Sequence, residues 1–160
     1  NQAYWTAMPY LGVGTSASSM LTREGYRRLC AIAPQLPSTD ERITRVRLTC
    51  TSGRHELARA AGFGDLHFDL ELLNEGQACA EDLMLAMRMV AGASQGLVGH
   101  ARNVLGLALV DEAMAWCEGR GLAHAEGGTW VPTDEGWLLG NELYGRLWDL
   151  APGAVARASC

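Results

Sequence analysis

Two stretches in the middle of the chain alternate hydrophobic and polar residues, which is typical of strands that bury one face. The first spans residues 43–51 and the second, DLHFDLELL, spans residues 65–73. Their polar positions are Arg45, Arg47, Thr49, His67, Asp69 and Glu71. Pairing of the two strands would place the arginines beside the carboxylates. The pattern therefore predicts two paired strands, with a short helix over residues 52–61 between them.

Other stretches repeat hydrophobic residues every three to four positions and predict helices. Thr22 is a suitable N-cap for a helix that ends before Pro34 and Pro37. The clearest helix is AEDLMLAMRMVAG, residues 80–92, because few of its positions are polar. A further helix is expected over residues 107–121. The helix at residues 80–92 should be largely buried, with its methionines in the core.

The last third of the chain predicts a hairpin followed by a helix. Residues 122–132 form two short apolar stretches around a Gly-Gly turn. Thr133 is a suitable N-cap for a helix that extends to Leu150. Two stripes run along this helix, namely Leu139, Leu143, Leu147 and Leu150, and Trp137, Tyr144 and Trp148. Helix, hairpin and helix in this order predict a winged-helix-like domain, and residues 151–160 are expected to form a loose tail.

The beginning of the chain predicts a different kind of structure. Residues 10–14, YLGVG, form a short apolar run that ends in glycine, which favours a buried strand followed by a tight loop. The small residues of TSASSM, which come next, allow a backbone to approach a ligand closely. We therefore expect an α+β protein with a boundary near residues 34–39. Residues 1–38 form one part, and residues 39–150 form the winged-helix-like domain.

Composition and charge narrow the class of protein. The chain has 160 residues, of which 48% are hydrophobic, as in a globular domain. Its net charge is −5, and all 13 basic residues are arginine. An acidic chain is a poor ligand for duplex nucleic acid, which requires a basic face. No apolar run approaches the roughly 20 residues that a membrane span needs. We therefore expect neither nucleic-acid binding nor a membrane span, and a cytoplasmic location.

The cysteines and histidines do not predict a metal site. The five cysteines are scattered at Cys30, Cys50, Cys79, Cys117 and Cys160. No C-x-x-C or C-x-x-x-C-x-x-C motif occurs, so neither a zinc knuckle nor an iron–sulfur cluster is expected in this chain. The cysteines are expected to be reduced and mostly buried. The four histidines also lack the spacing of metal ligands.

Three stretches together resemble one family. NQAYW and PYLGVGTSASSM resemble the end of the catalytic barrel of radical S-adenosylmethionine enzymes of the oxygen-independent coproporphyrinogen III oxidase type. AEDLMLAMRMVAG resembles the E-x-x-M-x-x-L-R-x-x-x-G helix of their C-terminal domain. WVPTDEGWLLGNELYGRLW resembles the L-T-x-x-G-x-x-x-x-N element near its end. The order and spacing of the stretches match the family over most of the chain.

The resemblance implies that this chain is the C-terminal piece of a longer protein. Residues 1–38 would then be the last strand and loop of a radical S-adenosylmethionine barrel. The parent would use S-adenosylmethionine and a four-iron, four-sulfur cluster to decarboxylate coproporphyrinogen III, a porphyrin precursor in haem biosynthesis. The piece itself would hold no cofactor and be inactive alone. A first strand without its neighbours would also favour self-association.

The resemblance also implies candidate site residues in the parent. Gly12, Gly14, Ala17 and Ser18 would lie at the barrel rim, near S-adenosylmethionine or the substrate. Tyr4, Trp5 and Tyr10 could line a tetrapyrrole pocket, and Arg88 could hold a propionate carboxylate in a bidentate contact. Each group also has a structural explanation. The loop could be a simple turn, the aromatic residues could belong to the core, and Arg88 could be a partly buried charge that orders the domain.

Two other functions remain open. Some members of the family resemble the oxidase but act as haem chaperones, so the parent could be a chaperone. The terminal helix, hairpin and helix could instead be a module that binds another protein. Binding to nucleic acid is disfavoured, because the predicted wing has no arginine and the preceding helix carries Asp111, Glu112 and Glu118.

Overall fold

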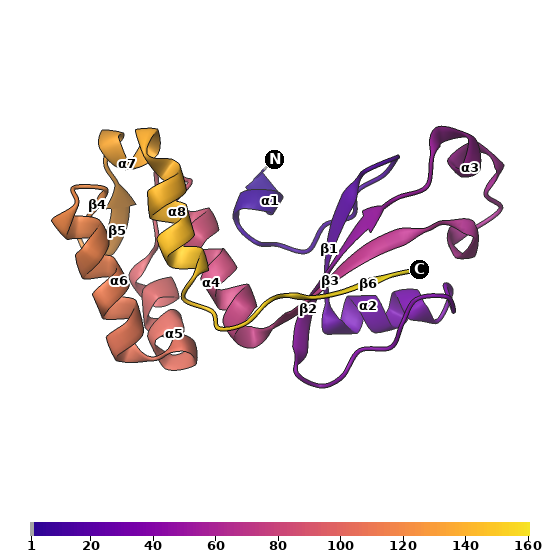
Figure 1. Cartoon of the computed structure of the whole chain (residues 1–160), viewed down its shortest axis with the longest axis horizontal. Helices are drawn as coiled ribbons and strands as arrows, with labels where there is room; N and C mark the ends of the chain where they lie inside the picture. Colours follow the sequence, from indigo (N-terminus) through magenta and orange to yellow (C-terminus); the bar gives the residue numbers. More distant parts are fainter. Residues whose placement is uncertain (1) are drawn as a thin grey trace. The chain divides into compact units, whose positions relative to one another are not determined.

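The computed structural model describes residues 2–160, which form a mixed α+β fold with antiparallel sheets (Figure 1). The chain divides into two compact units. The helical unit comprises the residues up to Ala7 together with Gly76–Gly153. The sheet unit comprises Met8–Glu75 and Ala154–Cys160. The boundary expected at residues 34–39 falls inside the sheet unit, because the segments on both sides of it contribute to one core.

The sheet unit contains a four-stranded antiparallel sheet with the order β1-β2-β3-β6. The strands are β1 (Ser18–Thr22), β2 (Ile43–Cys50), β3 (Phe68–Asn74) and β6 (Ala156–Ser159). The two strands predicted from the alternation are β2 and β3, and they pair with each other. Their register places Arg47 opposite Glu71, and the two side chains form an ion pair. The prediction that arginines lie beside carboxylates is therefore confirmed for Arg47, whereas Arg45 lies opposite Leu73.

One face of the sheet and helix α2 (Arg23–Cys30) enclose the core of this unit. The predicted N-cap is confirmed, since the Thr22 hydroxyl accepts a hydrogen bond from the Gly25 amide at 3.1 Å. Tyr26 is completely buried, and its hydroxyl donates to the carbonyl of Pro37 at 2.7 Å. The short helices α3 (Arg54–Arg59) and η1 (Phe63–Asp65) connect β2 to β3.

The predicted strand at residues 10–14 is wrong. Only Tyr10 forms a β-bridge, with Met20, and the strand β1 begins inside the segment predicted as a loop and extends to Thr22. The chain folds back tightly here, since the Gly12 amide donates to the Ser19 hydroxyl at 3.0 Å. A Cβ atom on Gly12 would lie 2.2 Å from the carbonyl oxygen of Ser18. The expected self-association through a strand at residues 10–14 loses its basis.

The expected loose tail is also wrong, because Ala156–Ser159 form β6 at the edge of the sheet. Beyond β6, Phe68 and Cys160 exchange two backbone hydrogen bonds, of 2.9 and 3.0 Å. The edge of β3 that does not face β2 would otherwise leave its amides and carbonyls unpaired. The tail thus completes the sheet, although its own sequence has no strand signal.

The helical unit consists mainly of α4 (Glu75–Ala86), α5 (Gln95–Leu105), α6 (Leu107–Gly119), a hairpin, α7 (Asp134–Leu138) and α8 (Gly140–Trp148). The short helix α1 (Gln2–Trp5) also belongs to it. The hairpin of β4 (Ala123–Glu126) and β5 (Thr129–Pro132) turns at two glycines, as predicted. Ala93 extends the hairpin through a bridge to Trp130. None of the helices that the structure describes is long and apolar enough to cross a membrane.

The predicted final helix is broken at Leu139 into α7 and α8. Leu143, Leu147 and Leu150 are buried in the core of the helical unit, as the stripe predicted. Leu139 was assigned to the same stripe but is exposed. Leu139 has φ −97° and ψ 32°, outside the helical region, so the helical periodicity does not continue from α8 back into α7.

The cysteines make no disulfide among the residues that the structure describes, and Cys50, Cys79 and Cys117 are buried. Burial raises the pKa of Cys117 from 9.0 to about 11. In the unfolded chain this thiol ionises near its ordinary pKa, so part of the stability should be lost as the pH rises from 9 to 11. The loss should be on the order of 1–3 kcal/mol, since each pKa unit corresponds to about 1.36 kcal/mol.

Urea unfolding at several pH values from 8 to 11 tests this prediction. The matched control is Cys117→Ala, whose free energy of unfolding should depend less steeply on pH over this range. Equal pH dependence of the two proteins would show that Cys117 does not contribute.

Candidate functional site

Three residues that the resemblance singled out belong to the helical unit, and the structure brings them together. The guanidinium carbon of Arg88 lies 5.9 Å from the ring centroid of Trp5 and 4.4 Å from that of Tyr144. The rings of Tyr4 and Trp5 contact edge to face, with centroids 5.0 Å apart. We call Tyr4, Trp5, Arg88 and Tyr144 the Arg88 cluster. It combines an exposed cation with aromatic rings on which the cation can rest.

Local structure explains how these side chains meet. Arg88 follows the last turn of α4, where its amide donates to the carbonyl of Leu85 at 3.0 Å. Tyr144 lies on α8, one turn after Gly140. A Cβ atom on Gly140 would lie 2.5 Å from the Tyr144 ring. Glycine at this position therefore lets the ring lie along the helix and accept Arg88.

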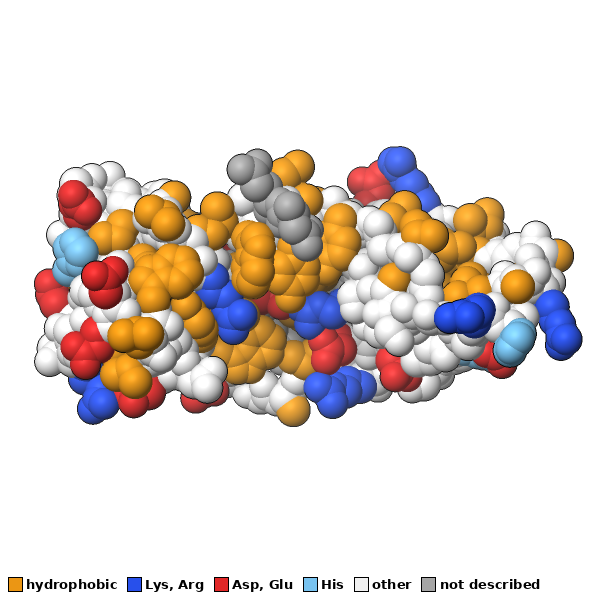
Figure 2. Space-filling model, turned by 90° about the horizontal axis from the view of Figure 1, so that it is seen from above, with side chains coloured by type: hydrophobic (Ala, Val, Ile, Leu, Met, Phe, Trp, Pro, Cys, Tyr) orange, Lys and Arg blue, Asp and Glu red, His pale blue; other side chains and the backbone are white. Residues whose placement is uncertain are grey.

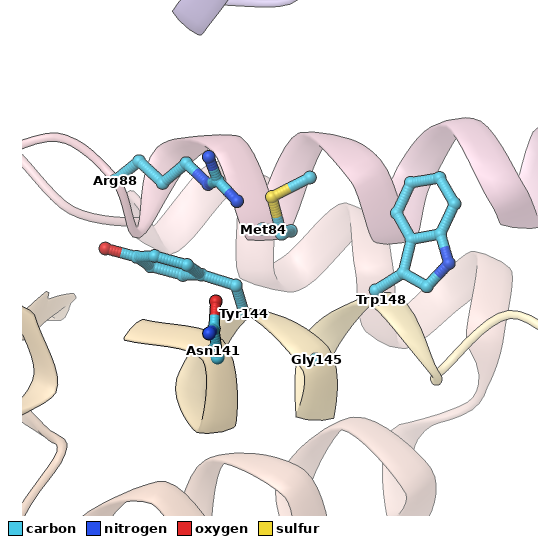
Figure 3. A pocket seen from close by; sticks show the side chains of 6 residues that line it. All are labelled: Met84, Arg88, Asn141, Tyr144, Gly145 and Trp148. Carbon is cyan, nitrogen blue, oxygen red and sulfur yellow. The ribbon is translucent and has the colours of Figure 1, made fainter. Parts of the chain in front are cut away.

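A pocket of about 290 Å³ opens beside the cluster. Its lining residues are Met84, Arg88, Asn141, Tyr144, Gly145 and Trp148. Figure 3 shows the Tyr144 ring under the Arg88 side chain, and Met84 between Arg88 and the Trp148 indole. The residues come from α4 and the turn after it on one side and from α8 on the other. The pocket thus has an apolar wall and one cationic end.

Arg88 differs from the other arginines of the helical unit in having no acidic partner. Arg102 pairs with Asp111, Arg120 with Glu142 and Arg146 with Glu112. Within residues 2–160, no carboxylate forms an ion pair with Arg88, which is also exposed rather than partly buried. A guanidinium stacked on rings keeps its N–H groups available for a carboxylate or phosphate in a planar, bidentate contact. The pocket therefore suits a ligand with an acidic group on an apolar body.

The four glycine-loop candidates belong to the sheet unit and do not join this cluster. The carbonyl of Ala17 accepts from the Cys50 amide at 3.0 Å, and Ser16 donates back to the Cys50 carbonyl at 2.9 Å. The Ser18 hydroxyl lies 2.8 Å from that of Thr49. These bonds fix the loop onto β2. Gly12 and Gly14 shape the turn that precedes it, which agrees with the structural explanation of the loop.

The sheet unit also has a polar groove of about 390 Å³ that sequence reasoning missed. It is lined by Thr49, Asp69, Leu70, Glu71, Arg157 and Ser159. Glu71 accepts from Arg47 and, at 3.1 Å, from Arg157, while Ser159 donates to Asp69 at 2.6 Å. The alternation in β2 and β3 indicated half of this groove. The other half comes from β6, in the segment expected to be loose.

The described residues of this chain do not form a site for the four-iron, four-sulfur cluster that the resemblance implies for the parent protein. Within residues 2–160, no three side chains of the histidine, cysteine, aspartate or glutamate type are grouped to hold a metal ion. Cys50 is buried in the core of the sheet unit, and Cys79 and Cys117 are buried in that of the helical unit. Among the described residues the cysteines are thus not grouped as ligands of a four-iron, four-sulfur cluster.

Comparison of the chain with protein-family models, curated proteins and solved structures finds no match. What the protein does is therefore inferred from its own residues and their geometry.

Proposed function

We propose that this chain is the C-terminal part of a radical S-adenosylmethionine protein of the oxygen-independent coproporphyrinogen III oxidase type. In this proposal Arg88 holds a carboxylate of the porphyrin-related substrate, and Met84 and Trp148 contact its apolar body. S-adenosylmethionine and the iron–sulfur cluster, when bound by the parent protein, supply the radical. The contribution of this chain is to bind and orient the substrate, and the chain alone is inactive.

The observation that carries the proposal is the meeting of three separated sequence elements at one side chain. Trp5 belongs to NQAYW, Arg88 to AEDLMLAMRMVAG, and Tyr144 to the element that begins at Trp130. These are the stretches on which the resemblance rests. The Arg88 guanidinium, which has no carboxylate partner among residues 2–160, lies within 6 Å of the ring centroids of both Trp5 and Tyr144. If these motifs served only to pack the fold, there would be no reason for all three to meet at an exposed arginine without a carboxylate partner.

The order of elements in the helical unit is compatible with the winged-helix-like domain of the proposal. Helix α4 is followed by the bridge residue Ala93, the helices α5 and α6, and the hairpin. Gly106 alone separates α5 from α6, so the two helices are directly connected. The unit carries four arginines against ten carboxylates, a net charge of −6. A recognition helix for DNA needs a basic face, so the charge favours another role for this unit.

The role of Arg88 can be tested on the 160-residue chain with coproporphyrin III, the oxidised and fluorescent form of the substrate. We expect Arg88→Met to weaken binding at least tenfold, since a charge-assisted bidentate contact contributes roughly 1.5–3 kcal/mol. Arg120→Met is the matched control, because Arg120 also stacks on an aromatic ring, that of Trp116, but lies outside the cluster. Fluorescence titration measures both affinities. Equal affinities of the two variants would contradict the role of Arg88.

The activity itself is tested on the product of the complete reading frame, reconstituted anaerobically with iron and sulfide. Conversion of coproporphyrinogen III to protoporphyrinogen with S-adenosylmethionine would support an oxidase. Cleavage of S-adenosylmethionine without decarboxylation, together with bound haem, would support the alternative of a haem chaperone. Absence of both cluster and tetrapyrrole binding would overturn the proposal and favour the second class of function, a module that binds another protein.

A further inference from the structure

The end of helix α7 and the residue that follows it present three consecutive large apolar residues to solvent. The exposed fractions are 42% for Trp137, 85% for Leu138 and 40% for Leu139. We call these three residues the α7 surface. A groove of about 360 Å³ lies along it, lined also by Asn141, Glu142 and Tyr144. Figure 2 shows hydrophobic side chains exposed among acidic ones on the face of the helical unit where α7 lies. Contiguous exposed apolar groups of this kind mark interaction sites more often than isolated ones do.

The exposure is a property of the fold, because α7 is held firmly on its other side. The Thr133 hydroxyl accepts from the Gly136 amide at 2.9 Å and donates to the Gly121 carbonyl at 2.6 Å. Gly136 is buried and packs directly against the backbone of Leu122. The apolar side chains therefore project from a rigid base. A preorganised surface loses less conformational entropy when it binds a partner.

The charge around the α7 surface is negative. Asp134 and Glu135 are exposed in the first turn of α7 and form no ion pair among residues 2–160. Three arginines of the helical unit are already paired with carboxylates, and Arg88 is stacked on rings. Arg88, which has no carboxylate partner among residues 2–160, stacks on Tyr144 of the groove lining, but no cation among these residues is paired with Asp134 or Glu135 beside it. This field attracts basic groups and repels phosphates.

We propose that the α7 surface is the docking site for a segment of a partner protein that combines large apolar residues with lysine or arginine. The apolar side chains of the segment fill the groove, with Trp137 as the central anchor, since tryptophan is enriched among residues that dominate binding energy. The basic residues of the bound segment face Asp134 and Glu135 and accelerate association. An anionic membrane or a nucleic acid is repelled by the same carboxylates. The proposal does not depend on the proposed function.

The test selects binders to the 160-residue chain from a random 12-residue peptide library displayed on phage. We expect the selected peptides to combine basic residues with leucine, isoleucine or aromatic residues. Binding of a labelled selected peptide is then measured by fluorescence anisotropy. Leu138→Glu should weaken it at least tenfold, and because this side chain is 85% exposed the change leaves the fold intact. Trp137→Ser should have an effect of similar size.

Further variants distinguish the contribution of the acidic residues from that of any exposed apolar residue. Asp134→Asn combined with Glu135→Gln should weaken binding three- to tenfold at low salt and reduce its dependence on salt. Val90→Ser is the matched control, because Val90 is equally exposed at 85% but lies outside the α7 surface, and it should bind normally.

Four results would overturn the proposal. One is selection of no peptides, or of peptides without basic residues. Another is binding that survives Leu138→Glu. The third is self-association of the chain that Leu138→Glu abolishes, because the occupant would then be a second copy of this protein. Binding to vesicles of phosphatidylserine and phosphatidylcholine that depends on Trp137 would equally contradict it.

Discussion

Replacement of Gly136 by alanine is expected to reduce the free energy of unfolding by about 3 kcal/mol or more. In an exposed helical position the same change gains up to about 1 kcal/mol, because alanine has the higher helix propensity. Here a Cβ atom would lie 1.9 Å from the carbonyl oxygen of Leu122 and 2.8 Å from its carbonyl carbon. Both atoms belong to backbone, which cannot rotate away as a side chain would. Helix α7 must therefore move away from the start of the hairpin, or the hairpin must distort.

Gly145→Ala is the matched control for this prediction. Gly145 lies in α8, and a Cβ atom there meets nothing within 4 Å. We expect this variant to be as stable as the unsubstituted 160-residue chain, or about 0.5–1 kcal/mol more stable. Urea unfolding followed by circular dichroism measures both variants. Equal stabilities would mean that α7 is not packed against Leu122 as described, and the rigid base of the α7 surface would be lost with it.

The strands that could be predicted are those whose pattern is local. In β2 and β3 the alternation of apolar and polar residues is itself a consequence of burying one face. Their register then follows from matching the two apolar faces, and it brings Arg47 to Glu71. The hairpin was equally predictable, because two adjacent glycines favour a tight turn. In each case the relevant residues are close in sequence or share a strong period.

The errors arise where distant residues decide the structure. Ala156–Ser159 form a strand only because the edge of β3 is open, and Phe68 and Cys160 are 92 positions apart. The segment around Gly12 reads as a strand by composition, but its amide is bonded to the Ser19 side chain instead of to a neighbouring strand. Tertiary contacts override local preference in both places.

The candidate site was predicted in part. Trp5 and Arg88 were chosen from separate motifs, and nothing in their spacing indicated that they would meet. Tyr144 was assigned to a stripe on a helix, and its role depends on the absence of a side chain at Gly140. Trp137 and Leu139 were assigned to stripes on one continuous helix. Both side chains are exposed and the helix is interrupted at Leu139, which the hydrophobic pattern did not indicate.

Removal of residues 154–160 is expected to destabilise the sheet unit by roughly 3–5 kcal/mol. β6 pairs with β3 from Asp69 to Leu72, and the bonds between Phe68 and Cys160 continue the pairing. Each net hydrogen bond contributes about 1 kcal/mol. Ala158 and Cys160 also pack on the core of the unit. Urea unfolding measures the loss, and amide hydrogen exchange should show faster exchange in β3 than in the full chain.

Arg157→Ala is the control that separates the strand from its exposed charge. It removes only the ion pair with Glu71, in which the arginine side chain is 77% exposed, so it should cost no more than about 1 kcal/mol. A truncated chain as stable as the full one, with unchanged exchange in β3, would restore the loose tail that the sequence predicts. If Arg157→Ala lowered the free energy of unfolding as much as the truncation does, the ion pair between Arg157 and Glu71 would account for the stability instead. The expected difference between the two variants follows from backbone pairing, which a side-chain substitution on an edge strand leaves in place.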